Sequence, residues 1–474
     1  MSLLAHLCNK LHKDMNMKNN ETDMQFKLSY AGDSRFASML EDPSFSIVLE
    51  LPSADEPASI KELLKYVGET PSVFAVALLD GSDIAPEKRQ LDFAEEAIAV
   101  TAKPVISYVS GRGKSYEDVR SVINSLRTLG LRDFVAVTGD FRKGTASYMD
   151  SLDIISAISE TGDDNCIGGV VNPFKYLHED QFFQYCKLIG KVNAGARFIV
   201  AQAGWDMKKY QELIWFLRSR EILVPAMARI CVIDTSDEGL LSMGIHPGVS
   251  VPLHIAAAAQ RSASDAARFT AEQAHTAAFV AAGCRLMGFN GIQLSGIHTA
   301  GELEAFLDEF NGILEKYPTF EAWATAWNET YNEIAFVPVM PNLGKKPPFY
   351  LYGSLMVPEI QAYDAKDAMS SEDAIPSPSF ADKLRYYFLA RQSTPECLRR
   401  AAKWLARCKY TDAQLDGCLG LNPDSCPKRL LKGPCGNCGP DGICETGEGL
   451  CIFQRIARLA LKNGLVSKLE GEKH

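Results

Sequence analysis

The sequence predicts a (β/α)8 TIM barrel followed by a small Cys-rich, metal-binding C-terminal domain. Eight short apolar or β-branched runs alternate with amphipathic helical patterns, which is typical of βαβ units around a parallel sheet. Eight of the 13 cysteines lie between Cys397 and Cys451. An open, doubly wound sheet is the alternative fold. The first run, however, ends in Leu49-Glu50-Leu51-Pro52 and lacks the Gly-rich phosphate turn of that fold.

The strands and helices of the barrel follow from the spacing of apolar residues. Helical patterns are clear at Tyr116–Leu129, Glu179–Ala194 and Met207–Arg218. The long interval 231–287 contains an Ala-rich run at 263–283, which we interpret as a helical insertion after the seventh strand. The eight predicted strands are residues 45–51, 73–79, 104–110, 133–139, 166–172, 196–204, 223–230 and 288–296.

Composition changes along the chain predict four segments. Aromatic residues in the Pro-rich third segment suggest that part of it packs on the barrel. The last segment, called the Cys-rich tail below, begins with a basic amphipathic helix over 381–410 and closes with a helix over about 450–464. The segments are an N-terminal extension (1–40), the barrel (41–335), a linker (336–380) and the Cys-rich tail (381–474).

The overall composition excludes several classes of protein. The chain has 474 residues, 46% of them hydrophobic and 23% charged, as in ordinary globular proteins. Its net charge of −10 argues against a nucleic-acid partner, which usually requires a basic balance. No apolar run is long enough to cross a bilayer, and the N-terminus lacks the pattern of a secretory signal. We therefore expect a cytoplasmic protein.

Candidate catalytic residues are expected where barrel strands end, because barrel active sites lie at the carboxyl ends of the strands. Glu50 ends the first strand among apolar neighbours, which disfavour a charged carboxylate and suit a general acid. The alternative is a carboxylate that is paired with Lys or Arg, or that faces solvent.

Two further strand ends carry polar groups. Asp140 follows Thr138-Gly139 at the end of the fourth strand and could point into the barrel mouth, or it could cap a helix or turn. Gln202 ends the sixth strand and can both donate to and accept from a planar heterocycle. Asp206 is expected to cap the helix that follows, and Trp205 to pack.

The cysteines of the tail predict a metal site, because such clusters in a reducing compartment more often bind metal than form disulfides. The glycines around Cys435 and Cys438 allow the backbone to fold around a metal. One four-Cys zinc site would use half of the set, and two iron–sulfur clusters would use all of it. Cys397 and Cys408 are the best candidates for free thiols. The set is Cys397, Cys408, Cys418, Cys426, Cys435, Cys438, Cys444 and Cys451.

Four stretches, in order and with matching spacing, resemble the methylenetetrahydrofolate reductase family across residues 40–310. They are Phe45–Pro52, Gly130–Asp140, Lys191–Ala196 and Ala201–Asp206. This family has a (β/α)8 barrel, binds a flavin and interconverts 5,10-methylenetetrahydrofolate and 5-methyltetrahydrofolate in one-carbon metabolism.

The resemblance implies roles for individual residues. Glu50 matches the general acid of the family, Asp140 a carboxylate between flavin and folate, and Gln202 a pterin contact. Tyr148 and Lys191 match positions that contact the flavin, and Lys191 would meet a phosphate. Altered residue types stand at the flavin-contacting positions of Thr138, Asn172 and Tyr176.

These departures leave the flavin (FAD or FMN) and the electron donor open. The tail resembles a Cys-rich domain of reductases from anaerobic bacteria, fused or as a separate subunit. Such a domain suggests an electron route other than simple pyridine nucleotide, so the expected donor is NAD(P)H or a protein electron carrier. The cysteines predict [4Fe-4S] clusters or zinc in the tail. Basic residues such as Lys428, Arg429 and Lys432 could dock an acidic carrier or form a solvated face. We also expect a homo-oligomer.

Two other functions remain possible from the sequence. The barrel could be a flavin-free module that binds methyltetrahydrofolate for a methyltransfer system, as the altered Thr138 and Tyr176 suggest. The tail could be a structural zinc domain that serves only to dock subunits.

Overall fold

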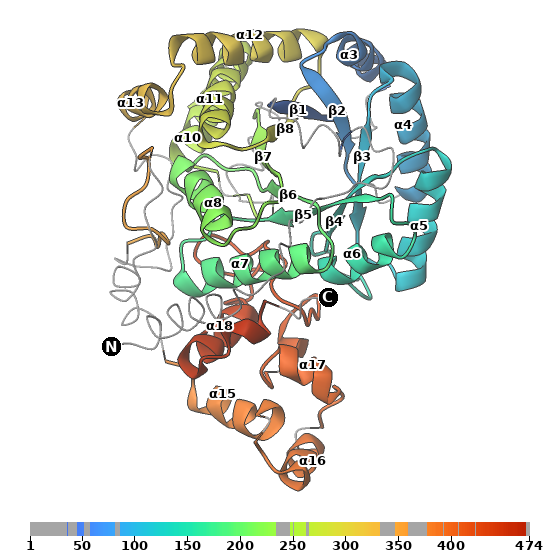
Figure 1. The fold of residues 1–474 in the computed structure, drawn as a ribbon, viewed down its shortest axis with the longest axis vertical. Helices are drawn as coiled ribbons and strands as arrows, with labels where there is room; N and C mark the ends of the chain where they lie inside the picture. The colour runs from blue at the N-terminus through green and yellow to red at the C-terminus, as the bar shows by residue number, and fades with distance from the viewer. Residues whose placement is uncertain are drawn as a thin grey trace, which may run out of the picture.

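Eight parallel strands close into a barrel in the order β1 to β8, and each pairs with its neighbour in the chain, with β8 returning to β1 (Figure 1). The strands are β1 (Ser46–Glu50), β2 (Val73–Leu78), β3 (Val105–Ser110), β4 (Asp133–Val137), β5 (Cys166–Val171), β6 (Phe198–Ala201), β7 (Ala226–Cys231) and β8 (Gly291–Ser295). The computed structural model describes residues 36, 45–51, 57–80, 86–233, 247–249, 251–261, 265–331, 347–358, 377–391, 393–405, 407–421 and 423–470.

Helices surround the barrel as an outer ring, and a smaller helical group lies below it in Figure 1. The ring consists of α3 (Pro57–Glu69), α4 (Pro86–Thr101), α5 (Tyr116–Thr128), α6 (Ser151–Ser159), α7 (His178–Asn193), α8 (Met207–Ser219), α10 (Leu253–Arg261), α11 (Ala266–Met287), α12 (Ala300–Lys316) and α13 (Phe320–Thr330). The smaller group consists of α15 (Phe380–Arg385), α16 (Glu396–Leu405), α17 (Asp412–Gly417) and α18 (Ile452–Asn463).

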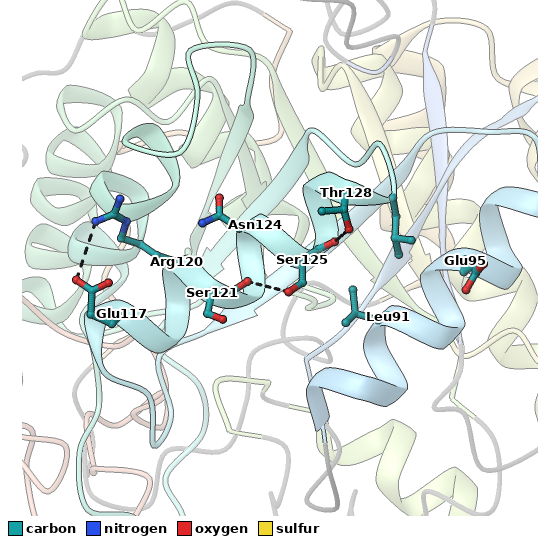
Figure 2. A pocket seen from close by; sticks show the side chains of 9 residues that line it. Leu91, Glu95, Glu117, Arg120, Ser121, Asn124, Ser125 and Thr128 are labelled. Carbon is teal, nitrogen blue, oxygen red and sulfur yellow. Dashed lines mark hydrogen bonds and ion pairs between the residues drawn. The ribbon is translucent and has the colours of Figure 1, made fainter.

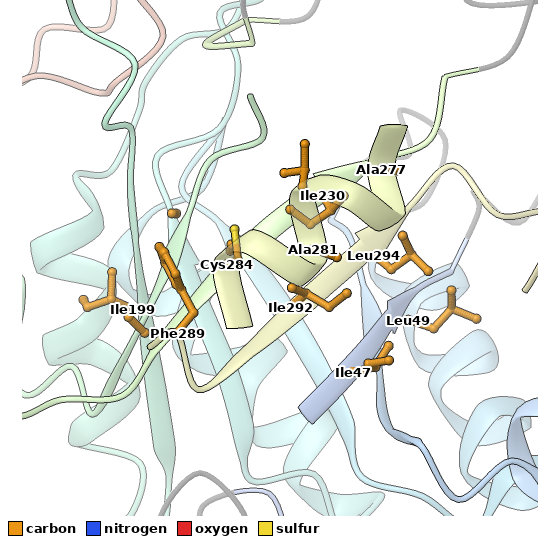
Figure 3. Close-up of a cluster of buried hydrophobic side chains, with 14 of the residues drawn as sticks. Ile47, Leu49, Ile199, Ile230, Ala277, Ala281, Cys284, Phe289, Ile292 and Leu294 are labelled. Atoms are coloured by element: carbon orange, nitrogen blue, oxygen red, sulfur yellow. The ribbon is translucent and has the colours of Figure 1, made fainter. Parts of the chain in front are cut away.

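The barrel has an apolar core on each side of its strands. Inside the barrel, Phe36 packs edge-to-face on Phe198, with ring centroids 5.3 Å apart. Outside, a larger cluster fills the space between the strands and the helices. Figure 3 shows part of it, where Ala281 and Cys284 of α11 face Ile292 of β8. Because the strands are buried on both faces along most of their length, they are mostly apolar in sequence.

The Cys-rich tail packs on helix α7 of the barrel. Phe183 of α7 and Phe453 of α18 meet edge-to-face at 5.5 Å, in a cluster that also buries Cys418 and Cys426. Arg458 of α18 donates to the Glu179 carboxylate at 2.6 Å. Helix α7 is therefore buried on both sides, by the barrel and by the tail.

The structure confirms the predicted fold class, and all eight predicted strands are present. The Ala-rich run forms helix α11, and the closing helix is α18. The single helix predicted over 381–410 is wrong. The chain forms α15, a π-helical turn at Tyr386–Ala390 and then α16, with a break before Pro395, whose missing N–H cannot continue a helix. Apart from Phe36, the N-terminal extension lies outside the described residues.

Part of the predicted linker packs on the barrel, as its aromatic residues suggested. Residues 347–358 lie along α8, where Phe349 N donates to the Tyr176 carbonyl and the Tyr350 hydroxyl to Asp206. The rest of the predicted linker that precedes residue 377 lies outside the described part of the chain. Among the described helices, none combines the length and the apolar character that crossing a membrane requires.

Candidate active site

A polar cavity of about 300 Å³ opens at the carboxyl ends of the barrel strands. Three of the predicted strand-end residues, Thr138, Asp140 and Gln202, line it. The Cys-rich tail supplies another part of the wall through Cys435, Gly436 and Asn437. Its remaining lining residues include Tyr108, Asn172, Gln184, Lys191 and Arg229. This position is the one at which (β/α)8-barrel enzymes have their active sites.

A second, larger hollow of about 690 Å³ lies on the outside of the barrel between α4 and α5. Figure 2 shows that polar helix side chains such as Ser121, Asn124 and Thr128 line it. It is an open groove lined by residues of two outer helices and the turn after α5, with none from a strand, so we place the candidate active site in the smaller cavity.

Glu50 does not line the cavity but pairs with Arg229, which does. The Arg229 guanidinium donates to both of its oxygens, from Nε at 2.8 Å and from Nη2 at 2.5 Å. The Gln293 amide donates to the same carboxylate at 2.6 Å. The expectation that apolar neighbours surround the Glu50 carboxylate is therefore wrong. The side chain makes the pairing with arginine that the sequence left open.

Arg229 and Tyr108, which the sequence reasoning did not select, connect Glu50 to the cavity. Arg229 Nη1 donates to Gln202 Oε1 at 3.1 Å, and the Tyr108 hydroxyl donates to Gln293 Oε1 at 2.7 Å. Burial would lower the pKa of Arg229, but the Glu50 carboxylate outweighs it and raises that pKa. Burial, together with Glu50, raises the pKa of Tyr108. The sequence signal that could have identified Arg229 is its position as the charged residue in the apolar run of the seventh predicted strand.

Asp140 is an exposed residue of the turn that follows β4. The turn requires glycine before it, because Gly139 has φ of +83° and a Cβ there would lie 2.4 Å from Ser110 Oγ. Asp140 does not cap a helix. Its Oδ1 accepts a hydrogen bond from Asn437 Nδ2 at 2.7 Å.

The five predicted flavin-contacting residues are only partly brought together. Thr138, Asn172 and Lys191 line the cavity. Tyr176 is fully buried behind it and donates to Asp206 at 3.0 Å, and Tyr148 stacks on Phe141 outside the cavity lining. The cavity volume is at the lower end of the range for one small-molecule ligand. The residues present therefore fit one planar ring with an anionic group near Lys191.

Lys191 is a buried lysine in the wall of the cavity. Its Nζ donates to the Val170 carbonyl. Burial, with a smaller contribution from Lys187, lowers the pKa of Lys191 to about 7. An anionic group bound beside it would restore the charged form.

This shift predicts a pH dependence of stability. The unfolded chain, where the pKa of lysine is about 10.4, binds more protons than the folded chain between pH 7 and 10, so stability rises with pH there. Relative to Lys191→Met, the wild-type free energy of unfolding should increase by up to about 1.4 kcal/mol per pH unit. Urea unfolding of both proteins across this range measures it. Lys432→Met, at an exposed ion pair, is the control. If the free energies of unfolding of wild type and Lys191→Met changed in parallel with pH, the prediction would be wrong.

Four of the eight tail cysteines lie in two pairs, Cys438 with Cys451 and Cys418 with Cys426. Cys438 and Cys451 share a hydrogen bond, which lowers the pKa of Cys438 to about 6 and raises that of Cys451. Cys418 and Cys426 are buried together, whereas Cys397 is exposed on α16. Within the described ranges, no three His, Cys, Asp or Glu side chains are arranged to hold a metal ion. The predicted metal site therefore stays a prediction.

The fold and the site together define a (β/α)8-barrel protein with a polar cavity at the carboxyl ends of its strands. Residues 64–299, from α3 to the end of the loop after β8, match the model of the methylenetetrahydrofolate reductase family. The barrel belongs to that family.

No curated protein sequence matches the chain. Among solved structures, it resembles a Clostridium thermocellum protein that binds two copies of 5-methyl-5,6,7,8-tetrahydrofolic acid, with 13% identity and a TM-score of 0.41 over 59% of this chain and 99% of that one. It also resembles oxaloacetate acetylhydrolase, with 10% identity and a TM-score of 0.38 over 61% of this chain and 89% of that one. The likeness to 2,3-dimethylmalate lyase has 15% identity and a TM-score of 0.36 over 59% of this chain and 84% of that one. All three are distant likenesses.

Proposed function

We propose that the protein is a flavin-dependent oxidoreductase that interconverts 5,10-methylenetetrahydrofolate and 5-methyltetrahydrofolate. The observation that carries the proposal is the convergence of Asp140, Gln202 and the Arg229–Glu50 pair at one face of a barrel of this family. These groups come from the ends of β4, β6, β7 and β1. They supply acceptors, donors and a paired acid around one cavity.

The polar residues of the cavity suit a reduced pterin. Gln202 keeps its amide donor, Nε2, for the ligand, because its Oε1 already accepts from Arg229 and from the Ala203 N–H. Asp140 supplies a carboxylate acceptor for N–H groups of the ring. Glu50 is the proton donor of this proposal, and because it is paired with Arg229 as a carboxylate, it would have to take up a proton before passing it toward the bound folate.

A flavin would supply the hydride acceptor or donor of this reaction. Thr138, Asn172 and Lys191 are the residues that would hold it, and Lys191 would meet its phosphate. The electron donor would be NAD(P)H or a protein carrier. For the tail we propose [4Fe-4S] clusters or zinc, held by its cysteines.

The absorption spectrum of the purified protein tests the flavin. We expect flavin absorption that is released on denaturation, and metal analysis of the same anaerobic sample should find iron or zinc. Absence of flavin from active protein would contradict this part of the proposal. Broad absorption near 400 nm that bleaches on reduction would favour iron–sulfur over zinc.

Glu50→Gln is expected to lower the rate of folate turnover about 100-fold or more, because it removes the proton donor. Reduction of the flavin by the electron donor should be spared. Stopped-flow measurement of the two half-reactions separates these effects. Glu95→Gln, on the outer groove, is the control, and equal loss of both half-reactions would exclude the acid role of Glu50.

The second candidate function is a flavin-free module that binds methyltetrahydrofolate for methyltransfer. The cavity volume of about 300 Å³ favours it, because this space suits one ligand better than two. A preparation without flavin that still binds methyltetrahydrofolate would support this candidate.

A further inference from the structure

Three side chains of the Cys-rich tail hold the turn at the end of β4. Lys428 Nζ donates to the Gly139 carbonyl at 2.6 Å, and Asn437 Nδ2 donates to Asp140 Oδ1 at 2.7 Å. Glu445 Oε2 accepts from the Phe141 N–H at 3.0 Å. Three consecutive residues of the barrel are thus each bound by a different residue of the tail.

The same three tail residues also bind one another. Lys428 Nζ lies 2.5 Å from Glu445 Oε1, and these two side chains are only 2% and 5% exposed. Asn437 Nδ2 lies 3.0 Å from Glu445 Oε2. The buried ion pair fixes the amide of Asn437 before any ligand arrives. The sequence suggested that Lys428 docks an acidic carrier or lies on a solvated face. Both are wrong for this residue, because its side chain is buried in the ion pair with Glu445.

The loop that carries Asn437 is fixed to the barrel by its backbone. Gly436, with φ of +91° in the left-handed region, presents its carbonyl to Asn172 Nδ2 at 2.8 Å and to Lys175 Nζ at 2.9 Å. Lys187 Nζ donates to the Gly433 carbonyl at 3.1 Å. These bonds place Asn437 in the wall of the cavity.

We propose that Asn437 is a positioning residue of the barrel's site, which orients the Asp140 carboxylate toward a bound reduced pterin. Asn437 occupies Oδ1 of Asp140, and within the described residues no group donates to Oδ2, so this oxygen is left for the ligand. The inference rests on the proposed function. It makes the tail a part of the folate site as well as a candidate metal domain.

The test is titration of the full-length protein with 5-methyltetrahydrofolate by calorimetry. Asn437→Ala should weaken binding about tenfold, as expected for the loss of a hydrogen bond to a charged group. In an Asp140→Ala background the same substitution should have no further effect, because Asn437 acts through Asp140. Lys432→Ala is the matched control, since it breaks another tail–barrel contact, to Asp153 at 2.5 Å, and should bind as wild type does.

Asn437→Asp keeps the size of the side chain and serves as the second variant if Asn437→Ala fails to fold. It should weaken binding at least as much, because it adds a carboxylate beside Asp140 and Glu445. Wild-type affinity in either folded variant, or additive losses with Asp140→Ala, would overturn the positioning role while the proposed function stands. Absence of binding by the wild type would overturn both.

Discussion

Lys209→Met is expected to lower the free energy of unfolding by about 3–5 kcal/mol. Lys209 and Glu212 form an ion pair of 3.0 Å on α8 in which both side chains are 0% exposed. Removal of the ammonium group leaves a carboxylate buried without a compensating charge, which is far more costly than losing an exposed pair. Urea unfolding of the full-length protein, followed by circular dichroism, measures the change.

The substitution should also loosen residues 347–358. Lys209 Nζ donates to the Phe349 carbonyl at 2.9 Å and lies 4.8 Å from the ring centroid of Tyr350. Glu212 accepts a hydrogen bond from the Leu351 N–H. Since this pair binds the segment to the barrel, proteolysis within it should become faster in the variant.

Two further variants separate a lost charge pair from general damage. Lys209→Met combined with Glu212→Gln should recover part of the stability, because Glu212 then carries no charge, whereas the buried Asp206 carboxylate beside Lys209 still lacks its cation. Lys65→Met, at an exposed position of α3, should change stability by less than about 0.5 kcal/mol. A double variant as unstable as the sum of its single changes would show that packing, and not charge, explains the loss.

The barrel could be predicted from sequence because each strand carries its own local signal. Runs such as Val73–Leu78 are apolar on both faces, and the helices between them have a 3.6-residue period. The chain reversal at each strand end is equally local, as Gly139 shows. The helix break before Pro395 was readable as well, because proline excludes a continuous helix whatever its surroundings.

The pairing of side chains across the barrel could not be predicted in the same way. Glu50 and Arg229 are 179 residues apart, and Asp140 and Asn437 are 297 apart. Which residues meet at such separations depends on strand register and on how the tail packs on α7, and neither leaves a local pattern. The sequence therefore predicted the candidate strand ends and left a cation partner for Glu50 open, but it did not predict that Arg229 is this cation or that the tail holds Asp140.

Arg229→Met is the second substitution with a large expected effect, a loss of about 3 kcal/mol in the free energy of unfolding. It leaves the Glu50 carboxylate, whose side chain is 7% exposed, with the Gln293 amide but no cation. Arg229 itself keeps 23% exposure toward the cavity, so the value lies at the lower end of the range for buried pairs. Chemical unfolding measures it.

Combining Arg229→Met with Glu50→Gln should restore stability to within about 1 kcal/mol of wild type, because both charges of the pair are then absent. Binding of 5-methyltetrahydrofolate should remain weakened in this stable double variant, since Gln202 has lost the Nη1 donor that orients its amide. Calorimetric titration distinguishes the two roles. Wild-type affinity would mean that Arg229 serves only to balance the charge of Glu50, whereas weak binding by a stable protein shows that it also orients Gln202 toward the ligand.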